Sequence, residues 1–471
     1  MTSANQGRNL ASLLRERLER APATVEDPSE RLDAGALLSR ADALAAELRR
    51  HGITPDEPVM IGVGNRAADI AAFLGVWTAG GVAIPIHASS PAAVVETLRA
   101  ATATRLIVEG ATGDVTKVAA EPPPQRPLLD GAALVILTSG STGTPKGVVI
   151  GHDRFAAKLD ALQGMLGFTP RTDTLLPLQV TFIFGIWAGL LTILAGGRLR
   201  MMPKFTPAAV RAALEDGVTT AALVPTMLRA LFASEGQVPS APRLRQILTG
   251  GEPLGGGLAA MIGEAFPDAG LFDLYGLTET GSCDFHATPE IRAAAAGTIG
   301  LPTPGVEFRI DATTGELLIR TPFGMLGYLD QPDLTAASFD DGWFRTGDLA
   351  RLHPLGHVEL VGRAKDIISR GGNKIAPMEI DRLFCGHPDV AAALTTGVPD
   401  PLLGERLHVL IVPRAGATLD AGTLAGWATG RIERFKIPDA FHFAPELPLG
   451  RTGKADRGAL RGWINDRIEK P

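Results

Sequence analysis

Apolar residues in the first quarter of the chain follow two spacings, one typical of helices and one typical of buried strands. Between Leu37 and Leu48 they recur three and four positions apart, which predicts a helix that ends at Gly52. Unbroken apolar runs further on predict buried strands, with helical spacing between them. The predicted strands are residues 59–63, 82–86 and 106–108, and the predicted helices between them are residues 67–79 and 92–100. Because strands that alternate with helices build parallel sheets covered by helices, the pattern predicts an α/β fold.

The pattern changes twice further along the chain. The alternation of strands and helices continues to about Gly270, and short strands with close turns follow at residues 305–362. A separate small α/β unit begins after Arg363 and ends in a charged helix. We therefore expect an N-terminal domain of parallel-rich sheets flanked by helices with a small β-subdomain, residues 1–363, and a C-terminal α/β domain, residues 364–471.

Composition limits the classes of protein that this chain can belong to. Its 471 residues are too many for one hydrophobic core, which agrees with two domains. The net charge of −6 gives no electrostatic case for binding nucleic acid or an anionic membrane. The apolar stretch at residues 183–195 is shorter than the roughly 20 residues that span a bilayer, and the N-terminus lacks a signal-peptide core. Two distant cysteines, Cys283 and Cys385, fit free thiols in a reducing compartment, so we expect a cytoplasmic protein without stable membrane insertion.

A loop rich in glycine and hydroxyl residues carries the strongest chemical signal. It follows the apolar run 132–137, a predicted strand, and reads Thr-Ser-Gly-Ser-Thr-Gly-Thr-Pro-Lys-Gly over residues 138–147. Glycine lets backbone N–H groups converge on phosphate oxygens, and Lys146 adds a mobile positive charge. The spacing does not fit the G-x-x-x-x-G-K-[ST] phosphate loop of kinases and NTPases.

Four further segments place rare or charged residues in turns. The chain has only two tyrosines, and Tyr275 opens the stretch Tyr-Gly-Leu-Thr-Glu-Thr after a predicted strand. The hydroxyl of Thr278 and the carboxylate of Glu279 offer oxygen ligands that suit Mg²⁺, which fills the rest of its coordination shell from phosphates and water. Asp348 follows a turn, where its carboxylate is able to accept both hydroxyls of a ribose, and Arg363 adds a guanidinium at the domain junction. Lysines are scarce, yet three of them lie in glycine-rich turns: Lys146, Lys374 and Lys454.

These segments, in this order, resemble the adenylate-forming superfamily of acyl-CoA synthetases, nonribosomal-peptide adenylation domains and luciferases, over essentially the whole chain from Leu37 to Arg457. The resemblance implies an active site between a large N-terminal domain and a small mobile C-terminal domain, with ATP, Mg²⁺ and coenzyme A as ligands. It places the catalytic roles on Lys454, Glu279 and Thr278, the last two also serving Mg²⁺. It assigns ATP binding to Thr138, Ser139, Gly140, Ser141, Thr142, Gly143, Lys146, Gly251, Glu252, Asp273, Tyr275, Gly276, Asp348 and Arg363. It makes Lys365 the hinge, and Arg370, Gly371, Gly372 and Lys374 candidates for binding coenzyme A.

The acid is expected to bind near residues 177–187. The resemblance implies an acyl pocket that includes Phe182, Phe184, Gly185, Trp187 and Gly250. This stretch carries no charge, and a buried ammonium without a partner is costly, so an α-amino acid is disfavoured. Many acyl-CoA ligases have a gating histidine where this chain has Phe182, so the sequence does not identify the residue that gates the pocket. The aromatic side chains favour an aryl or short-to-medium acyl acid, as in benzoate-CoA ligases, unless they belong to the core.

The sequence leaves three alternatives for function. The first is an AMP-forming acid–thiol ligase that transfers the acyl group to coenzyme A. The second is a stand-alone adenylation enzyme that loads the phosphopantetheine of a carrier protein. The third is a non-catalytic nucleotide-binding relative, which the presence of Lys454, Glu279, Asp348 and Arg363 disfavours. Monomer and dimer both remain open.

Overall fold

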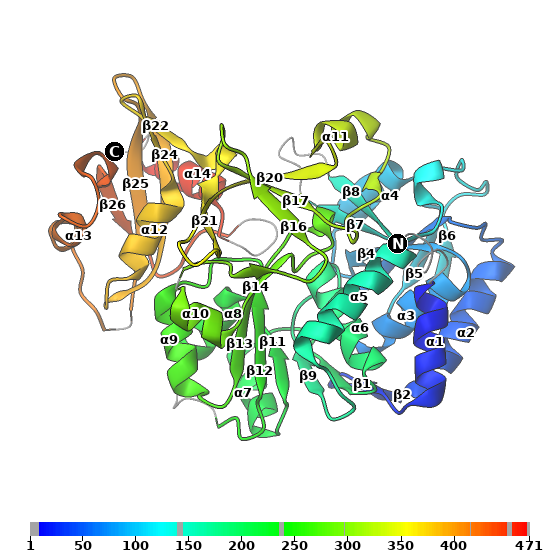
Figure 1. Cartoon of the computed structure of the whole chain (residues 1–471). Helices are drawn as coiled ribbons and strands as arrows, with labels where there is room; N and C mark the ends of the chain where they lie inside the picture. Colours follow the sequence, from blue (N-terminus) through cyan, green and yellow to red (C-terminus); the bar gives the residue numbers. More distant parts are fainter. Residues whose placement is uncertain are drawn as a thin grey trace.

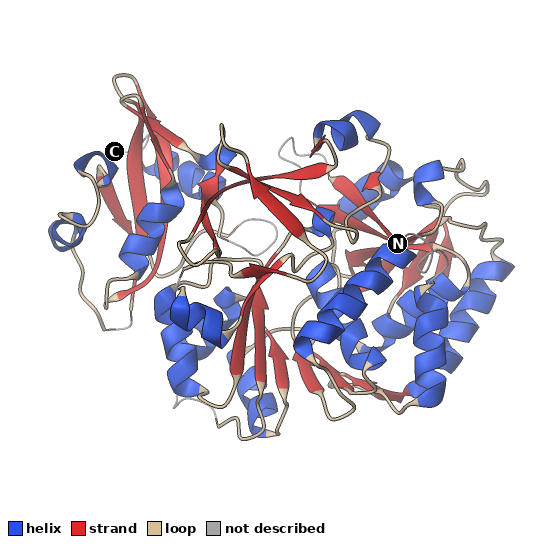
Figure 2. Cartoon of the chain, in the orientation of Figure 1, coloured by secondary structure: helices blue, strands red, loops and turns tan. Residues whose placement is uncertain are grey.

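Strands within the described residues form four β-sheets (Figures 1 and 2). The computed structural model describes residues 9–138, 145–234, 240–295, 297–414, 416–449 and 455–468. Two large sheets occupy the N-terminal part, a smaller sheet follows them, and a fourth sheet is built from the C-terminal segment.

The first large sheet has seven strands in the order β18-β8-β7-β4-β3-β5-β6, with β3, β4, β5 and β7 parallel. Its strands are β3 (Pro58–Val63), β4 (Val82–His87), β5 (Leu106–Glu109), β6 (Val115–Lys117), β7 (Ala132–Thr138), β8 (Lys146–Gly151) and β18 (Gly327–Tyr328). The helices of this region are α1 (Leu10–Arg20), α2 (Ala34–Arg50), α3 (Ala67–Thr78), α4 (Ala92–Thr102) and α5 (His152–Leu166). The expected helix near Leu37–Leu48 and the alternating strands and helices up to residue 108 are confirmed.

The second large sheet has nine strands in the order β15-β14-β13-β12-β11-β9-β10-β1-β2, with a parallel centre from β13 to β1. Its strands are β1 (Thr24–Glu26), β2 (Arg31–Asp33), β9 (Asp173–Leu176), β10 (Arg198–Met201), β11 (Thr220–Ala222), β12 (Gln246–Gly250), β13 (Gly270–Tyr275), β14 (Phe285–Ala287) and β15 (Leu301–Pro302). Its helices are α6 (Ile183–Leu194), α7 (Pro207–Glu215), α8 (Pro225–Ala233), α9 (Gly256–Ala265) and α10 (Pro289–Ala294).

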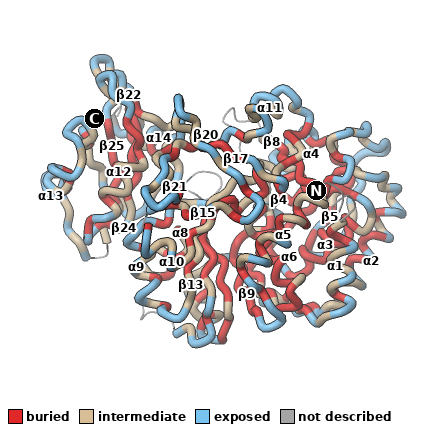
Figure 3. Tube along the Cα trace, viewed as in Figure 1, coloured by how far each residue is buried: buried red, intermediate tan, exposed pale blue. Residues whose placement is uncertain are grey.

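Helices α3, α5 and α6 contact strands of the two large sheets, and α1 packs on these three helices. All four contribute to the main hydrophobic core, whose buried residues are red in Figure 3. Helix α3 contacts strands of both sheets, and every residue from Ala67 to Trp77 is buried, because the sequence is apolar apart from Asp69, whose carboxylate accepts from the N–H groups of Gly64 and Arg66. None of the described helices combines the length and the hydropathy needed to cross a membrane. The apolar α6 has 12 residues and is part of this core.

The last two sheets are smaller. One consists of β16 (Glu307–Ile310), β17 (Glu316–Arg320), β19 (Phe339–Asp340), β20 (Trp343–Leu352) and β21 (Val358–Arg363), with α11 (Pro332–Ala337) beside it. The other consists of β22 (Ile368–Arg370), β23 (Asn373–Ile375), β24 (Val390–Asp400), β25 (Gly404–Pro413) and β26 (Ala440–Phe443). Helices α12 (Pro377–Cys385), α13 (Ala421–Ala428) and α14 (Arg457–Ile468) accompany this C-terminal sheet (Figure 1). The mixed α/β architecture expected from the sequence is confirmed.

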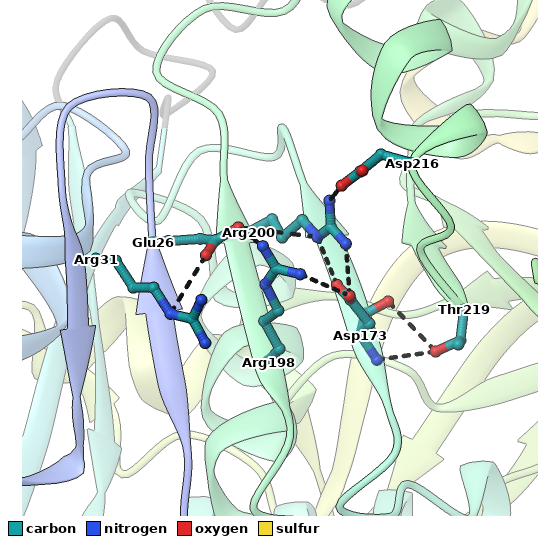
Figure 4. Close-up of polar contacts among 7 residues, drawn as sticks. All are labelled: Glu26, Arg31, Asp173, Arg198, Arg200, Asp216 and Thr219. Atoms are coloured by element: carbon teal, nitrogen blue, oxygen red, sulfur yellow. Dashed lines mark hydrogen bonds and ion pairs between the residues drawn. The ribbon is translucent and has the colours of Figure 1, made fainter.

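A network of ion pairs joins the first strands of the chain to the middle of the nine-stranded sheet (Figure 4). Asp173 receives a bidentate pair of hydrogen bonds from Arg200, at 2.7 Å each, and its backbone N–H donates to Thr219. Glu26 of β1 accepts from Arg198 at 2.6 Å, and Arg198 also reaches Asp173. Asp173 and Arg198 are the first residues of β9 and β10, at the strand ends away from the carboxyl ends of β12 and β13, so the network is structural.

Histidine 152 links α1 to the start of α5 and makes stability depend on pH. Its Nδ1 accepts a hydrogen bond from the backbone N–H of Leu10 at 3.2 Å, and its ring packs edge-on against Trp77. Burial lowers the pKa of His152 to about 4, because the neutral ring is favoured there. Unfolding restores the ordinary pKa near 6.5, so the stabilisation is complete above that pH and is lost as pH falls towards 4. We expect this histidine to account for roughly 3 kcal/mol of the acid-induced loss of unfolding free energy.

The contribution of His152 is measurable by urea unfolding at pH 7 and pH 4.5. The variant H152Q keeps an acceptor for Leu10 but does not titrate, so its unfolding free energy is expected to change less between the two pH values. The variant H87Q replaces an exposed histidine and serves as control. Equal pH dependence in H152Q and the parent protein would contradict the assignment.

Candidate active site

Parallel pairing of β12 and β13 brings two of the sequence motifs to one edge of the nine-stranded sheet. Gly250, the last residue of β12, lies opposite Leu274, next to Tyr275 at the end of β13. The residues after each strand therefore leave the sheet side by side, because carboxyl ends of parallel strands meet at the same edge. The motifs 250–253 and 275–280 are brought together there. Gly250 permits this close approach, since a Cβ at that position would lie 2.3 Å from the carbonyl oxygen of Leu274.

Glu279 lies in a short 3₁₀ turn, Thr278–Thr280, directly after β13. Its carboxylate accepts a hydrogen bond from the hydroxyl of Tyr328 on β18 at 3.0 Å. Its backbone carbonyl accepts from the N–H of Met325 at 2.8 Å. The turn after the nine-stranded sheet is thus joined to the edge strand of the seven-stranded sheet.

Lys146 approaches the same tyrosine. It is the first residue of β8 and pairs with Thr138, the last residue of β7, so these two residues close the base of the glycine-rich loop. Its Nζ lies 5.3 Å from the centre of the Tyr328 ring. Ser139, Gly140, Ser141, Thr142 and Gly143 lie outside the described residues. The base of the loop therefore faces Tyr328, which contacts Glu279.

The other tyrosine, Tyr275, contacts another of the predicted carboxylates, Asp348. The hydroxyl of Tyr275 donates to Asp348 at 2.6 Å, and Nε of Arg363 donates to the second oxygen of Asp348 at 2.9 Å. Asp348 and Arg363 face each other across the antiparallel strands β20 and β21. Burial and the Asp348 carboxylate raise the pKa of Tyr275 well above its usual value, so the hydroxyl keeps its proton and acts as donor.

Three further residues that the resemblance assigns to ATP binding lie on β13 or directly after β12. Burial raises the pKa of Asp273 on β13 to about 7. Gly251 adopts φ 79°, a left-handed conformation that glycine accepts without strain. Glu252 accepts from the N–H and the hydroxyl of Thr226, at 3.1 and 2.6 Å, and so caps the start of α8.

The expected acyl-pocket residues fall into different environments. Trp187 is fully buried in the main core, so its packing alone explains an aromatic residue there. Phe184 is half-buried and stacks on Trp187 with ring centres 4.9 Å apart, whereas Phe182 precedes α6 and is 42% exposed. Gly185 packs so closely that a Cβ would lie 2.5 Å from the carbonyl oxygen of Gln179.

A buried asparagine holds the segment before α6 in place. The amide of Asn65 donates to the carbonyl oxygens of Leu176 and Met202, at 3.0 and 2.9 Å. Its own oxygen accepts from the N–H of Val180 at 3.2 Å. Asn65 therefore fastens the ends of β9 and β10 and the candidate acyl segment to the end of β3. Periodicity gave no signal for this residue, because only the folded chain brings these segments together.

The C-terminal candidates lie on the fourth sheet and the turn that leads to it. Lys365 is exposed in the 3₁₀ turn Ala364–Asp366, between β21 and β22. Arg370 pairs with Asp439, and Nζ of Lys374 donates to the hydroxyl of Ser369 at 2.6 Å. Gly371 and Gly372, both with positive φ, form the turn between β22 and β23. Lys454 lies outside the described residues.

Comparison with known proteins identifies the family. Residues 14–329 match the AMP-binding enzyme family, and residues 379–454 match the AMP-binding enzyme C-terminal domain. The chain belongs to the AMP-binding enzyme family. The resemblance to adenylate-forming enzymes, inferred from the motifs alone, is therefore confirmed.

This AMP-binding enzyme is similar to proteins of several kinds, of which two relatives and one solved structure are examples. The feruloyl-CoA synthase of Amycolatopsis sp is 30% identical, covering 97% of this chain and 99% of the relative. The fatty acid–[acyl-carrier-protein] ligase ScoC of Streptomyces coeruleorubidus is 30% identical, covering 78% of this chain and 75% of the relative. The crystal structure of ATP-bound MatB from Rhodopseudomonas palustris superposes with a TM-score of 0.86 at 24% identity, covering 98% and 99% of the two chains. The last comparison confirms the fold.

Both tyrosines of this AMP-binding enzyme hold a carboxylate that the motifs predicted. Tyr275 was predicted as a site residue, whereas Tyr328 was not, although its rarity in the sequence was a usable signal. Burial and the Glu279 carboxylate raise the pKa of Tyr328, so its hydroxyl also remains a donor. Tyr328 is thus the residue that joins Lys146 to Glu279.

The donor atoms in this AMP-binding enzyme fit Mg²⁺ bound together with a nucleotide. The described residues contain no group of three or more histidine, cysteine, aspartate or glutamate side chains suited to holding a metal alone. Mg²⁺ is commonly held by one or two carboxylates while phosphates and water complete its shell. Glu279, with one oxygen on Tyr328 and its second oxygen without a hydrogen bond among the described residues, matches that requirement. Of the two cysteines, Cys283 is buried, and burial raises the pKa of both thiols to about 11, which favours the protonated thiol at neutral pH.

Proposed function

We propose that this AMP-binding enzyme is an AMP-forming acid–thiol ligase, which adenylates a carboxylic acid with ATP and transfers the acyl group to coenzyme A. The observation that carries the proposal is the convergence of Lys146 and Tyr328, both on the seven-stranded sheet, with Glu279 in the turn after β13. The feruloyl-CoA synthase, similar over nearly the whole chain, supports coenzyme A as the acceptor. In the same proposal the enzyme works in the cytoplasm, where ATP and coenzyme A are both present.

ATP binding divides between two groups of residues in this proposal. The loop from Thr138, with Ser139, Gly140, Ser141, Thr142 and Gly143, holds the β- and γ-phosphates together with Lys146. Asp348, held by Tyr275 and Arg363, accepts the ribose hydroxyls. Gly251, Glu252, Asp273 and Gly276 line the adenine side, and Thr278 and Glu279 hold Mg²⁺ when it is bound. When bound, the cation would neutralise negative charge on the phosphates.

The chemistry needs positive charge because both reactants are anions. In the first step a carboxylate oxygen of the acid attacks the α-phosphorus of ATP, and the bond to pyrophosphate breaks. Lys454 neutralises charge on the carboxylate and α-phosphate, and Lys146 and the loop N–H groups hold the departing pyrophosphate. In the second step the thiol sulfur of coenzyme A attacks the acyl carbon, the thiol loses its proton, and AMP leaves. The acyl-adenylate is a reactive anhydride, so the closed site must exclude water between the steps.

The acid in our proposal is an aryl or short-to-medium acyl acid. The segment from Pro177 to Trp187 carries no charged side chain that would pair with a substrate ammonium. Phe182, Phe184, Gly185 and Gly250 line the pocket, with Trp187 supporting Phe184 from the core. Phe182, exposed at the start of α6, takes the position of the gate.

The C-terminal part, residues 364–471, turns about Lys365 between the two steps in this proposal, and Arg370, Gly371, Gly372 and Lys374 then contact coenzyme A. We expect K365P to reduce thioester formation at least about ten-fold more than adenylation, because proline fixes φ and restricts a hinge that must change its backbone angles. The two half-reactions are measured separately, by pyrophosphate exchange and by thiolysis of supplied acyl-adenylate. The variant K365A keeps backbone freedom and is the control. Equal loss of both half-reactions in K365P would contradict a hinge at this residue.

Acid-dependent ATP–pyrophosphate exchange across a panel of aryl, alkyl and amino acids tests the proposed function. We expect exchange with aryl or short-to-medium acyl acids, little with α-amino acids, and thioester formation when coenzyme A is added. Absence of pyrophosphate exchange with every acid in the panel would favour a non-catalytic nucleotide-binding protein.

Exchange without a coenzyme A thioester would favour loading of a carrier protein. The similarity to the ScoC acyl-carrier-protein ligase is the observation that keeps this second function in the test. A phosphopantetheinylated carrier protein offered in place of coenzyme A distinguishes the two acceptors.

A further inference from the structure

A fully buried ion pair lies behind the Glu279 turn. Lys158 on α5 and Asp284 are both 0% exposed, and their charged atoms are 3.6 Å apart. Nζ of Lys158 also donates to the carbonyl oxygen of Cys283 at 2.9 Å and lies 4.9 Å from the ring centre of Phe323. Removing two charges from water is costly, and apolar replacements of such pairs are often as stable, so stability alone is a weak reason for this pair.

Asp284 closes the turn that carries Glu279. Its carboxylate accepts from the backbone N–H of Leu277 at 3.3 Å and from the hydroxyl of Thr280. These two donors lie on either side of Glu279 in the chain. The same carboxylate faces Lys158, so the turn is tied at both ends to one side chain, and through it to α5.

Helix α5 also holds the other segment that touches Glu279. Arg154, one helical turn before Lys158, donates to the carbonyl oxygens of Gly324 and Met325, at 2.9 and 2.6 Å. Met325 in turn donates its N–H to the carbonyl oxygen of Glu279. The turn and the loop 323–325 therefore both rest on α5, and their relative position follows from it.

There is little room for the turn to move without breaking these contacts. A Cβ on Gly276 would lie 2.3 Å from the backbone nitrogen of Cys283, so the two ends of the segment 276–284 pack directly against each other. A Cβ on Gly281 would lie 2.6 Å from the carbonyl oxygen of Phe323. Loss of the Lys158 ammonium would remove the anchor of a closely packed segment, and small displacements of a binding group are costly.

We propose that Lys158 and Asp284 are positioning residues that aim the Glu279 carboxylate at Mg²⁺ bound with ATP. This inference rests on the proposed function, in which Glu279 serves the magnesium-bound nucleotide. Lys158 acts through Asp284 and the turn, without touching the nucleotide itself.

The test is isothermal titration calorimetry of ATP binding, with Mg²⁺ and with EDTA, on the full chain. We expect K158M to weaken binding of magnesium-bound ATP by about ten- to a hundred-fold while binding of metal-free ATP changes less than about three-fold. The matched control is R105M, which breaks an equally buried ion pair with Glu57 away from the site. R105M is expected to lower the melting temperature as K158M does, and to leave the magnesium-dependent gain in affinity unchanged.

A second variant separates positioning from folding. K158M alone leaves a buried carboxylate unpaired, so K158M/D284N removes both charges and keeps an acceptor for Leu277 and Thr280. We expect its melting temperature to recover towards that of the parent protein while the defect in magnesium-bound ATP binding persists, because the ion pair that ties the turn to α5 through Asp284 is lost. A folded variant with normal affinity for magnesium-bound ATP, or the same affinity loss in R105M, would overturn the inference.

The outcomes also separate this inference from the proposed function. If the parent protein binds ATP more tightly with Mg²⁺ but exchanges pyrophosphate with no acid, the proposed function fails and the positioning role is still decided by calorimetry. If Mg²⁺ gives the parent protein no gain in affinity, Glu279 serves no metal and the inference falls with that premise.

Discussion

Replacement of Glu279 by glutamine is expected to slow adenylate formation by about a hundred- to a thousand-fold. Glutamine has the same size and keeps an oxygen that accepts from Tyr328, so the turn Thr278–Thr280 retains its anchor. What E279Q removes is the negative charge, and with it the ligand that our proposal gives to Mg²⁺. Acid-dependent ATP–pyrophosphate exchange measures the effect, and raising the Mg²⁺ concentration is expected to recover part of the rate.

The matched control for E279Q is E290Q. Glu290 is exposed on α10 and bonds to the hydroxyl of its neighbour Thr288, so removal of its charge is expected to leave exchange unchanged. A folded E279Q protein whose exchange rate stays within a few-fold of the parent protein would contradict the role of Glu279.

Replacement of Lys454 by alanine is expected to abolish adenylate formation and to leave thiolysis of supplied acyl-adenylate largely intact. The first half-reaction joins two anions, so an ammonium at the carboxylate and α-phosphate is worth at least about a hundred-fold in rate. The second half-reaction starts from an uncharged acyl carbon and releases AMP, and in our proposal it uses the other orientation of the C-terminal part. Pyrophosphate exchange reports the first step, and release of AMP from acyl-adenylate with coenzyme A reports the second.

The control for K454A is K436A on the same part of the chain. Lys436 pairs with Glu379 and Glu433, and our proposal gives it no role in either step. K436A is expected to retain both half-reactions. Parallel loss of both half-reactions in a K454A protein that remains folded would show that Lys454 does not act in adenylation alone.

Local spacing predicted the elements of the N-terminal part because the apolar residues themselves carry the period of each structure. The run 59–63 lies in strand β3, and the helix expected from Leu37 to Gly52 is α2, which begins earlier, at Ala34, and ends at Arg50. The ends were less well predicted because capping contacts, such as Asp33 at the start of α2, add little to hydrophobic periodicity.

Motif order predicted the family and most candidate residues, but not how they contact one another. Lys146 and Glu279 are far apart in sequence, and Tyr328, which lies between them in space, was not among the predicted site residues. Asn65 and Lys158 gave no signal either, since each acts through partners more than a hundred residues away.

The sequence by itself determined the α/β fold class and membership of the AMP-binding enzyme family. These conclusions depend on local periodicity and on residue types in fixed order, which are properties of the chain. Only the tertiary structure decided that Tyr328 joins Lys146 to Glu279, that Tyr275 and Arg363 hold Asp348, and that a buried Lys158–Asp284 pair stands behind the turn. Such contacts depend on which sheet edges meet and which side chains are buried together, and no local pattern contains that information.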